Sequence, residues 1–143
     1  MKKFQIGILL LLLTAVTVGF LFLRESRKPK TFSSAEAICV KVLEKHRQEM
    51  EALASEKGSG TFRDFSYHSD PQRKWVSFSI GGQGMLGGQY WDLVYTADGT
   101  YNGETESYLF EEPEGNNICR AKRITGNWWY CWMDYDGTEK SWK

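Results

Sequence analysis

A run of 20 residues without a charged side chain, residues 4–23, constrains this chain more than any other feature of its sequence. As a helix it would be roughly 30 Å long, which is the thickness of the hydrocarbon core of a membrane. The apolar run continues past the best candidate cleavage site, after Gly19, and so predicts an uncleaved single-pass anchor rather than a signal peptide. We therefore expect a transmembrane helix over residues 4–23, a basic linker up to residue 30, and one domain over residues 31–143.

Charge also divides the chain at residue 30. Residues 1–30 carry six basic side chains and one acidic side chain, whereas the whole chain carries 18 of each, so residues 31–143 have a net charge of −5. An acidic domain argues against nucleic acid as a partner, because phosphates require a basic surface. Aromatic residues make up 15% of the chain and only three residues are proline, which favours a folded domain.

An amphipathic helix is predicted directly after the linker. Ser33 and Glu36 have the spacing of a capping box, and Gly58 marks the end of a helix of about 24 residues. Apolar positions recur at spacings of three and four and form one stripe: Ala35, Ile38, Cys39, Val42, His46, Met50 and Leu53. We expect this stripe to pack against a sheet.

Beyond Gly60 the pattern changes to the alternation that is typical of strands. Asp98-Gly99 predicts a tight hairpin, and Thr125-Gly126-Asn127 predicts a hairpin with glycine in the left-handed region. The predicted fold class is α+β, with one helix laid across a four- to six-stranded antiparallel meander. The candidate strands cover residues 65–67, 75–80, 90–97, 100–111, 118–124 and 128–135.

The spacing of Cys119 and Cys131 predicts a disulfide. Both lie six residues from Thr125, so a three-residue turn at residues 124–126 would place them directly opposite each other on adjacent strands. Their Cα atoms would then be about 4.5 Å apart, within reach of a disulfide. A two-residue turn would offset the pair and leave two reduced core thiols. Cys39, on the helix stripe, is expected to be a small buried apolar side chain.

The orientation in the membrane is predicted from the flanking charges and from the cysteines. Two lysines precede the apolar run, while four basic residues and one acidic residue follow it, so the positive-inside count is nearly balanced and leans toward a cytoplasmic C-terminus. The chain nevertheless starts with Met1-Lys2-Lys3 before its leucines, as secreted proteins do, and a disulfide requires an oxidising compartment. We therefore predict that the domain lies outside the cytoplasm.

No arrangement of residues predicts catalysis, a cofactor or a metal ion. Cys39 and His46 lie two helical turns apart, roughly 10 Å, which is too far for a nucleophile and its base. The two histidines and the dispersed cysteines lack zinc-site spacing. Residues 82–87 match the Gly-x-Gly-x-x-Gly pattern, but a strand-like segment follows instead of the helix that phosphate binding needs. The sequence thus predicts a protein that is not an enzyme.

Acidic residues gather before and after the fifth candidate strand. They could hold a carboxylate pair for acid–base chemistry. Since they would face the basic segment 120–123 across a hairpin, cross-strand ion pairs are the prediction that we favour. These residues are Glu104, Glu106, Glu111, Glu112 and Glu114.

Aromatic side chains alternate along the last candidate strand. Trp128, Tyr130 and Trp132 point to one face, and Trp129 and Tyr135 point to the other. Because only one face can meet the helix, the other would present rings outward as a stacking platform for a sugar, a cell-wall polymer or a partner protein. Trp128 and Trp132 are therefore candidate ligand-binding residues. The alternative is that another part of the chain, or the membrane headgroups, covers the outer face.

The glycine-rich segment 81–88 predicts a hairpin loop that a ligand could approach closely, with Gln83 and Met85 as its candidate contacts. Gln83-Gly84-Met85-Leu86-Gly87 is similar to the Gln-x-Val-x-Gly loop of cystatins, which also place a helix before an antiparallel sheet. Met85 stands where cystatins have valine. This resemblance implies a protease-inhibiting edge.

Two further resemblances concern architecture. Residues 90–100 and residues 128–138 share paired aromatic residues followed by Asp-Gly-Thr at a constant offset of 38. Each half resembles the aromatic hairpin of Gram-positive cell-wall-binding repeats. The order of apolar helix, amphipathic helix and sheet is similar in outline to pilin-like assembly subunits, although Arg24 stands where their processing motif has glutamate.

Taken together, these patterns predict a membrane-anchored, extracytoplasmic binding or interaction module. The membrane would be contacted through residues 4–23, and the partner would be a protein or a cell-wall polymer. A carbohydrate-binding domain, a cystatin-like inhibitor and a pilin-like assembly subunit are the alternatives.

Overall fold

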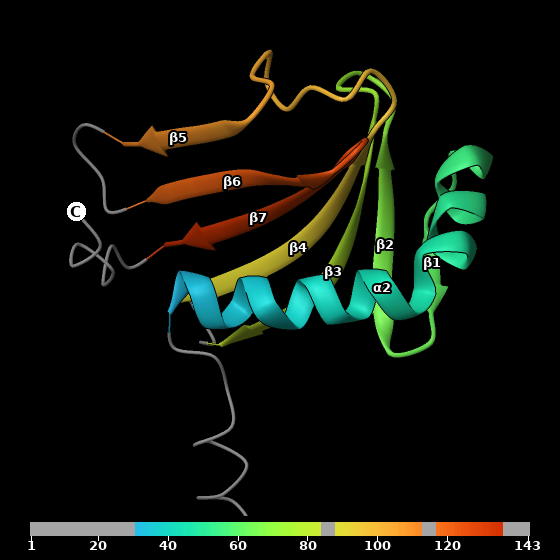
Figure 1. Ribbon diagram of the computed structural model, residues 1–143, viewed down its shortest axis with the longest axis horizontal. Helices are drawn as coiled ribbons and strands as arrows, with labels where there is room; N and C mark the ends of the chain where they lie inside the picture. The colour runs from blue at the N-terminus through green and yellow to red at the C-terminus, as the bar shows by residue number, and fades with distance from the viewer. Residues whose placement is uncertain (1–30, 84–87, 113–116, 136–143) are drawn as a thin grey trace, which may run out of the picture. The chain divides into compact units, whose positions relative to one another are not determined.

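A computed structural model of the chain describes residues 31–83, 88–112 and 117–135 (Figure 1). The chain divides into two units, Met1–Lys30 and Thr31–Lys143, and all described residues belong to the second. The transmembrane helix predicted at residues 4–23 therefore lies outside the described residues. Within the described part, we find no helix that is both long and apolar enough to cross a membrane.

The described residues confirm the α+β class: a helix packs on an antiparallel sheet. The sheet has seven strands where the sequence predicted four to six, because residues 60–62 form an additional strand at one edge. The elements are α2 (Phe32–Glu56), β1 (Gly60–Phe62), β2 (Phe65–Asp70), β3 (Trp75–Gln83), β4 (Gln89–Thr96), β5 (Ser107–Glu111), β6 (Ile118–Thr125) and β7 (Trp128–Asp134).

The strand order corrects the predicted meander. The sheet reads β1-β2-β3-β4-β7-β6-β5, so two consecutive antiparallel runs meet where β4 pairs with β7. The chain leaves β4 in the middle of the sheet and returns at the far edge as β5. The strand direction also turns progressively from β2 to β5, as Figure 1 shows, which is the normal twist of a sheet.

The connection from β4 to β5 explains this difference. Asp98 does not form the predicted hairpin: its carboxylate accepts hydrogen bonds from the backbone and the hydroxyl of Thr100, and the chain then leaves the sheet. The tight turn lies four residues later, at Asn102-Gly103, where both residues have positive φ, 49° and 87°. Tyr101 and Glu104 exchange backbone hydrogen bonds across this turn. Asn-Gly favours this turn type because both of its residues tolerate the left-handed region.

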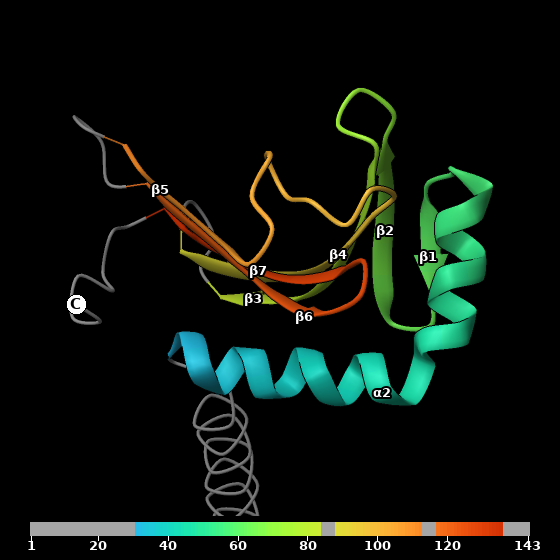
Figure 2. The same ribbon diagram turned by 45° about the horizontal axis from the view of Figure 1, so that its top comes forward.

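Helix α2 forms where the sequence predicts it, with a different cap. The capping box joins Thr31 to Ser34, and the helix ends at Lys57 in the left-handed conformation. Figure 2 shows α2 changing direction along its length, so that its first part follows the middle of the sheet and its last turns run beside β1. The residues buried under it are Ala35, Cys39, Leu43, Met50 and Ala54. Ile38, which the sequence assigned to the stripe, is 36% exposed.

The sheet carries a core on each face. The larger core lies under α2 and contains four buried aromatic side chains from β4 and β7: Trp91, Trp128, Tyr130 and Trp132. The smaller core lies on the opposite face, where Tyr101 from the β4–β5 connection covers Trp129, Val94 and Cys131. Trp75 stacks on Tyr101 with ring centroids 4.8 Å apart. The outer face is thus partly covered by the chain itself, the alternative that the sequence left open.

The predicted disulfide is corrected by the β6–β7 register. Thr125 pairs with Trp128, so the turn contains two residues, and the register shifts between Arg123 and Thr125. Cys119 therefore lies opposite Met133, and Cys131 lies opposite Ala121. Such diagonal positions have Cα atoms roughly 7–8 Å apart, beyond the usual reach of a disulfide. Both thiols are free. Gly126 does adopt the predicted left-handed conformation, with φ of 54°.

Candidate functional site

The structure places the two candidate tryptophans in the core. Trp128 and Trp132 are 2% and 0% exposed, because both point to the face that α2 covers. Trp132 stacks on Trp91, and the indole nitrogen of Trp128 donates a hydrogen bond to Glu51 at 3.1 Å. A ring enclosed in this way has no free face for a sugar. The burial therefore argues against the predicted stacking platform.

Gln83 lies at the end of β3. Its side chain hydrogen-bonds the side chain of Gln89, which in turn donates to the buried carboxylate of Asp134 at 3.3 Å. This row of polar groups joins β3, β4 and β7. Met85 lies outside the described residues, so its predicted role as a ligand contact stays a prediction.

A pocket of about 400 Å³ opens on the face of the sheet opposite α2. We call it the Asp92 pocket. Its floor comes from central strands, and its walls come from rings of β3, β5 and the β4–β5 connection. The residues that line it are Arg73, Trp75, Ser77, Asp92, Val94, Tyr101, Asn102, Tyr108, Phe110, Cys119, Cys131 and Met133.

Asp92 is the acidic group of this pocket, and it is only 9% exposed. It sits on β4 between Ser79 of β3 and Cys131 of β7. The Ser77 hydroxyl donates to its carboxylate at 2.8 Å, and Ser79 also hydrogen-bonds it. Burial raises the pKa of Asp92 to about 6, and the two serine hydrogen bonds oppose that rise. At neutral pH the pocket therefore holds a largely desolvated negative charge, and the hydroxyl groups of Ser77 and Ser79 hydrogen-bond it within the described residues.

The thiols and the phenol in the pocket stay protonated at neutral pH. Burial is the main cause that raises the pKa values of Cys119, Cys131 and Tyr101 above their ordinary values. The Tyr101 hydroxyl lies 4.0 Å from the sulfur of Cys119. Because the thiolate is the nucleophilic form of cysteine, these groups are poorly suited to covalent catalysis.

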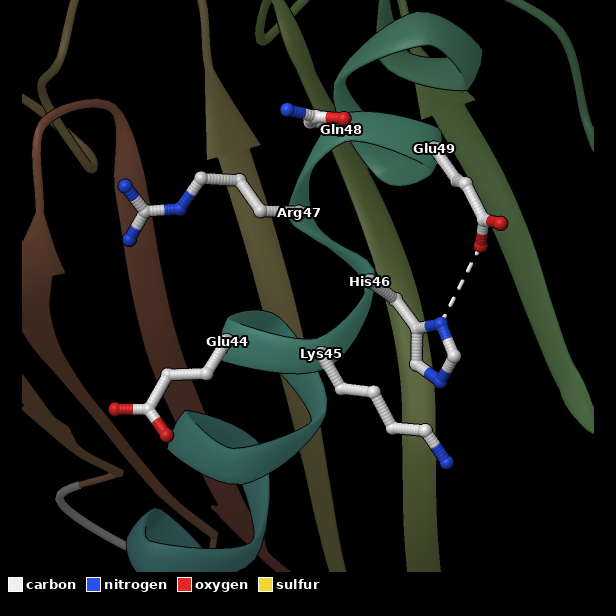
Figure 3. A pocket seen from close by; sticks show the side chains of 6 residues that line it. All are labelled: Glu44, Lys45, His46, Arg47, Gln48 and Glu49. Carbon is white, nitrogen blue, oxygen red and sulfur yellow. Dashed lines mark hydrogen bonds and ion pairs between the residues drawn. The ribbon is translucent and has the colours of Figure 1, made fainter.

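Two other hollows lack a buried carboxylate. One lies on α2 over residues 44–49 and is lined by polar side chains that diverge from one stretch of helix (Figure 3). There His46 contacts Glu49 at 3.3 Å, and Glu49 also pairs with Arg63. The other, of about 300 Å³, lies beside the end of α2, and its Asp70 caps the following turn by accepting from the backbone of Gln72 and Arg73. We therefore take the Asp92 pocket as the candidate site.

The histidines lie away from the pocket. His68 is on β2, where its ring nitrogen lies 2.8 Å from the Ser59 hydroxyl, and both residues are exposed. His46 packs edge-on against Phe62. Within the described residues, no group of three or more histidine, cysteine or acidic side chains is arranged to hold a metal ion.

Sequence reasoning missed Asp92, although the sequence contains a signal for it. Asp92 is the one charged residue in the strand-like segment 89–96, and aspartate is depleted in strands. A charge in the middle of a central strand must be solvated by neighbours or by a ligand. The serines that solvate it come from β3, and this pairing follows from the fold rather than from local spacing.

Comparison of the chain with protein-family models, with curated proteins and with solved structures found no match. The functional argument therefore rests on the geometry of the pocket.

Proposed function

We propose that this protein is a ligand-binding module without catalytic activity and that the ligand occupies the Asp92 pocket. The observation that carries the proposal is a buried carboxylate on the floor of a cavity with aromatic walls. Small-molecule sites commonly combine an apolar lining with a few convergent polar groups that fix the orientation of the ligand. A volume of about 400 Å³ suits a molecule with one or two rings.

The charge of the pocket selects the ligand chemistry. An ammonium group would supply to Asp92 the positive charge that Ser77 and Ser79 lack, together with further hydrogen-bond donors. Tyr108, Phe110 and Met133 would contact an apolar or aromatic body. We therefore infer a small amphipathic amine as the ligand class.

The proposed function includes a location at a membrane. We propose that residues 4–23 anchor it in a membrane and that residues 31–143 lie outside the cytoplasm. The uncharged run and the lysines before it support this assignment. The free thiols of Cys119 and Cys131 remove the disulfide from the reasons for an extracytoplasmic domain.

The proposal is tested by calorimetric titration of the full chain in detergent micelles with tryptamine as the probe. We expect tryptamine to bind and tryptophol, which has a hydroxyl group in place of the amine, to bind at least about tenfold more weakly. The Asp92→Asn variant should lose this preference. Asp64→Asn, which neutralises an exposed carboxylate between β1 and β2, is the matched control and should retain it.

The pH dependence provides a second readout. Binding of the amine should weaken as the pH falls below about 6, because Asp92 then becomes protonated. Equal binding of the amine and the alcohol, or binding of the amine that Asp92→Asn leaves unchanged, would exclude the Asp92 pocket as an amine site.

A further inference from the structure

The outer edge of β5 presents backbone groups that the rest of the described chain does not use. Arg123 donates its N–H to the carbonyl of Glu106 at 2.9 Å, and Glu112 donates to Asn117 at 3.0 Å. In an antiparallel ladder these bonds recur at every second residue, so Tyr108 and Phe110 also face β6. Ser107, Leu109 and Glu111 consequently direct their N–H and C=O groups away from the sheet.

Apolar side chains flank this edge on both faces of the sheet. Leu109 is 54% exposed and Phe110 is 48% exposed, and successive residues of a strand point to opposite faces. An added strand would thus find a large apolar neighbour above it and another below it. Exposed edges of this kind are usually blocked by lysine, proline or a bulge. Residues 107–111 contain neither lysine nor proline, and they pair with β6 without a register shift.

The segment around β5 is negatively charged. Residues 101–112 contain four glutamates and no basic residue. Two of the basic residues of β6 have other printed partners: Lys122 pairs with Glu36 of α2 at 2.7 Å, and Arg123 donates to the backbone carbonyls of Thr105 and Gly126. The edge therefore favours a positively charged occupant.

A second copy of the chain fits this edge poorly. Antiparallel self-pairing centred on Leu109 would place Glu106 of one copy opposite Glu112 of the other, twice in each dimer. Like charges directly opposite each other destabilise a strand pair.

We propose that β5 binds an extended segment of a partner protein, with apolar central residues and basic flanks, as an additional antiparallel strand. Main-chain hydrogen bonds to Ser107, Leu109 and Glu111 provide the affinity, and the glutamates select the basic flanks. This interaction surface is separate from the proposed amine site: Phe110 borders both, whereas Leu109 and Glu106 do not line the Asp92 pocket.

The test uses the full chain in detergent micelles and a synthetic peptide, acetyl-Lys-Lys-Val-Ile-Val-Lys-Lys-amide, with fluorescence anisotropy for affinity. Hydrogen exchange then reports which amides are protected. We expect protection to increase at Ser107, Leu109 and Glu111. N-methylation of alternate peptide bonds, or replacement of the lysines by glutamate, should weaken binding at least about tenfold.

Protein variants separate the backbone contribution from the charge contribution. Leu109→Pro removes an outward N–H that β6 does not use, so it should abolish peptide binding, whereas Leu109→Ala should retain it in part. The double variant Glu106→Lys/Glu111→Lys should weaken binding about tenfold. Its matched control, Glu44→Lys/Glu56→Lys, makes the same charge change on the exposed side of α2 and should bind as the wild type does.

Three results would overturn this proposal. The N-methylated peptide could bind as tightly as its parent, or both double variants could weaken binding equally. The third result would be that the amides of Ser107, Leu109 and Glu111 become protected without peptide as the protein concentration rises. This result would show that a second copy of the chain binds the edge. Loss of amine binding in Asp92→Asn leaves this test unaffected, since Asp92 lies on β4.

Discussion

The carboxyl group of Asp92 couples the pocket to the stability of the domain. Its pKa is about 6 in the folded state, against an ordinary value of 3.8. Between about pH 4 and pH 6 the folded chain keeps this proton while the unfolded chain releases it, so the free energy of unfolding falls as the pH rises through this window. The difference in pKa corresponds to a loss of about 3 kcal/mol at most.

In the Asp92→Asn variant, the free energy of unfolding should no longer fall between about pH 4 and pH 6 because of this group. Urea unfolding at pH 4.5 and pH 7 should show that wild-type stability falls between the two pH values relative to the variant. Asp64→Asn serves as the control and should follow the wild type. Parallel pH profiles for the wild type and Asp92→Asn would show that Asp92 ionises normally in the folded state.

Gly81 is required for close packing of a tryptophan. A Cβ atom at this position would lie 2.6 Å from the ring of Trp91, which also stacks on Trp132. Gly81→Ala should therefore destabilise the domain by about 1–3 kcal/mol, as overpacking does. Gly58→Ala is the matched control, because no atom lies within 4 Å of the added Cβ. Equal unfolding midpoints for the two variants would refute this role of Gly81.

At the level of elements, β7 joins the two halves of the sheet and carries the core. Trp132 is fully buried between β7 and α2. Trp132→Ala should cost about 3–5 kcal/mol, measured by chemical unfolding. Tyr135→Ala, at an exposed aromatic position just beyond the same strand, should cost little. A stable Trp132→Ala variant with impaired ligand binding would restore the stacking platform that the sequence predicted.

The β6–β7 hairpin makes a prediction about its thiols. Cys131 and Cys39 are buried, and burial raises the pKa of each thiol, so both should react with iodoacetamide only on global unfolding. Cys119 is partly exposed and should react first. Mass spectrometry of labelled peptides measures this order. A Cys119–Cys131 linked peptide in protein from native membranes would contradict the two-residue turn register.

Local patterns predicted the elements well, whereas the pairing of strands depended on details outside those patterns. Helical spacing after residue 31 and alternation after residue 60 predict α2 and the strands because each pattern repeats over several residues. The choice between Asp98-Gly99 and Asn102-Gly103 as the tight turn decides whether β5 lies beside β4 or at the far edge. Both dipeptides favour turns, so the sequence alone did not separate them. The register of Cys119 and Cys131 depended in the same way on a single bulge near Thr125.

The candidate site was harder to predict than the fold, because it also depends on how the strands pair. The Asp92 pocket is assembled from β3, β4, β5, β6, β7, the β2–β3 turn and the β4–β5 connection, so no short segment contains its pattern. The aromatic residues of β7 are adjacent in sequence and therefore predicted a stacking platform. In the structure, they alternate between the cores on the two faces of the sheet. The one local signal was the charge of Asp92 within an apolar strand, and the fold places that residue in the pocket.

For the whole molecule, the proposed anchor predicts how the protein fractionates. The full chain should sediment with membranes and resist alkaline extraction, because residues 4–23 carry no charge. A chain that starts at residue 31 should remain in the supernatant. Protease treatment of spheroplasts should then degrade the domain of the full chain, as expected for an extracytoplasmic location. Release of the full chain into the medium with a new N-terminus near Phe20 would contradict the anchor.

The most direct test of the proposed function is the pKa of Asp92 itself, measured by carbon-13 NMR of its carboxyl group with and without saturating tryptamine. We predict a midpoint at about pH 6 for the protein alone. With the amine bound, the midpoint should fall, because an adjacent ammonium group stabilises the carboxylate. A midpoint that saturating amine leaves unchanged would contradict the proposal that the Asp92 pocket is the binding site.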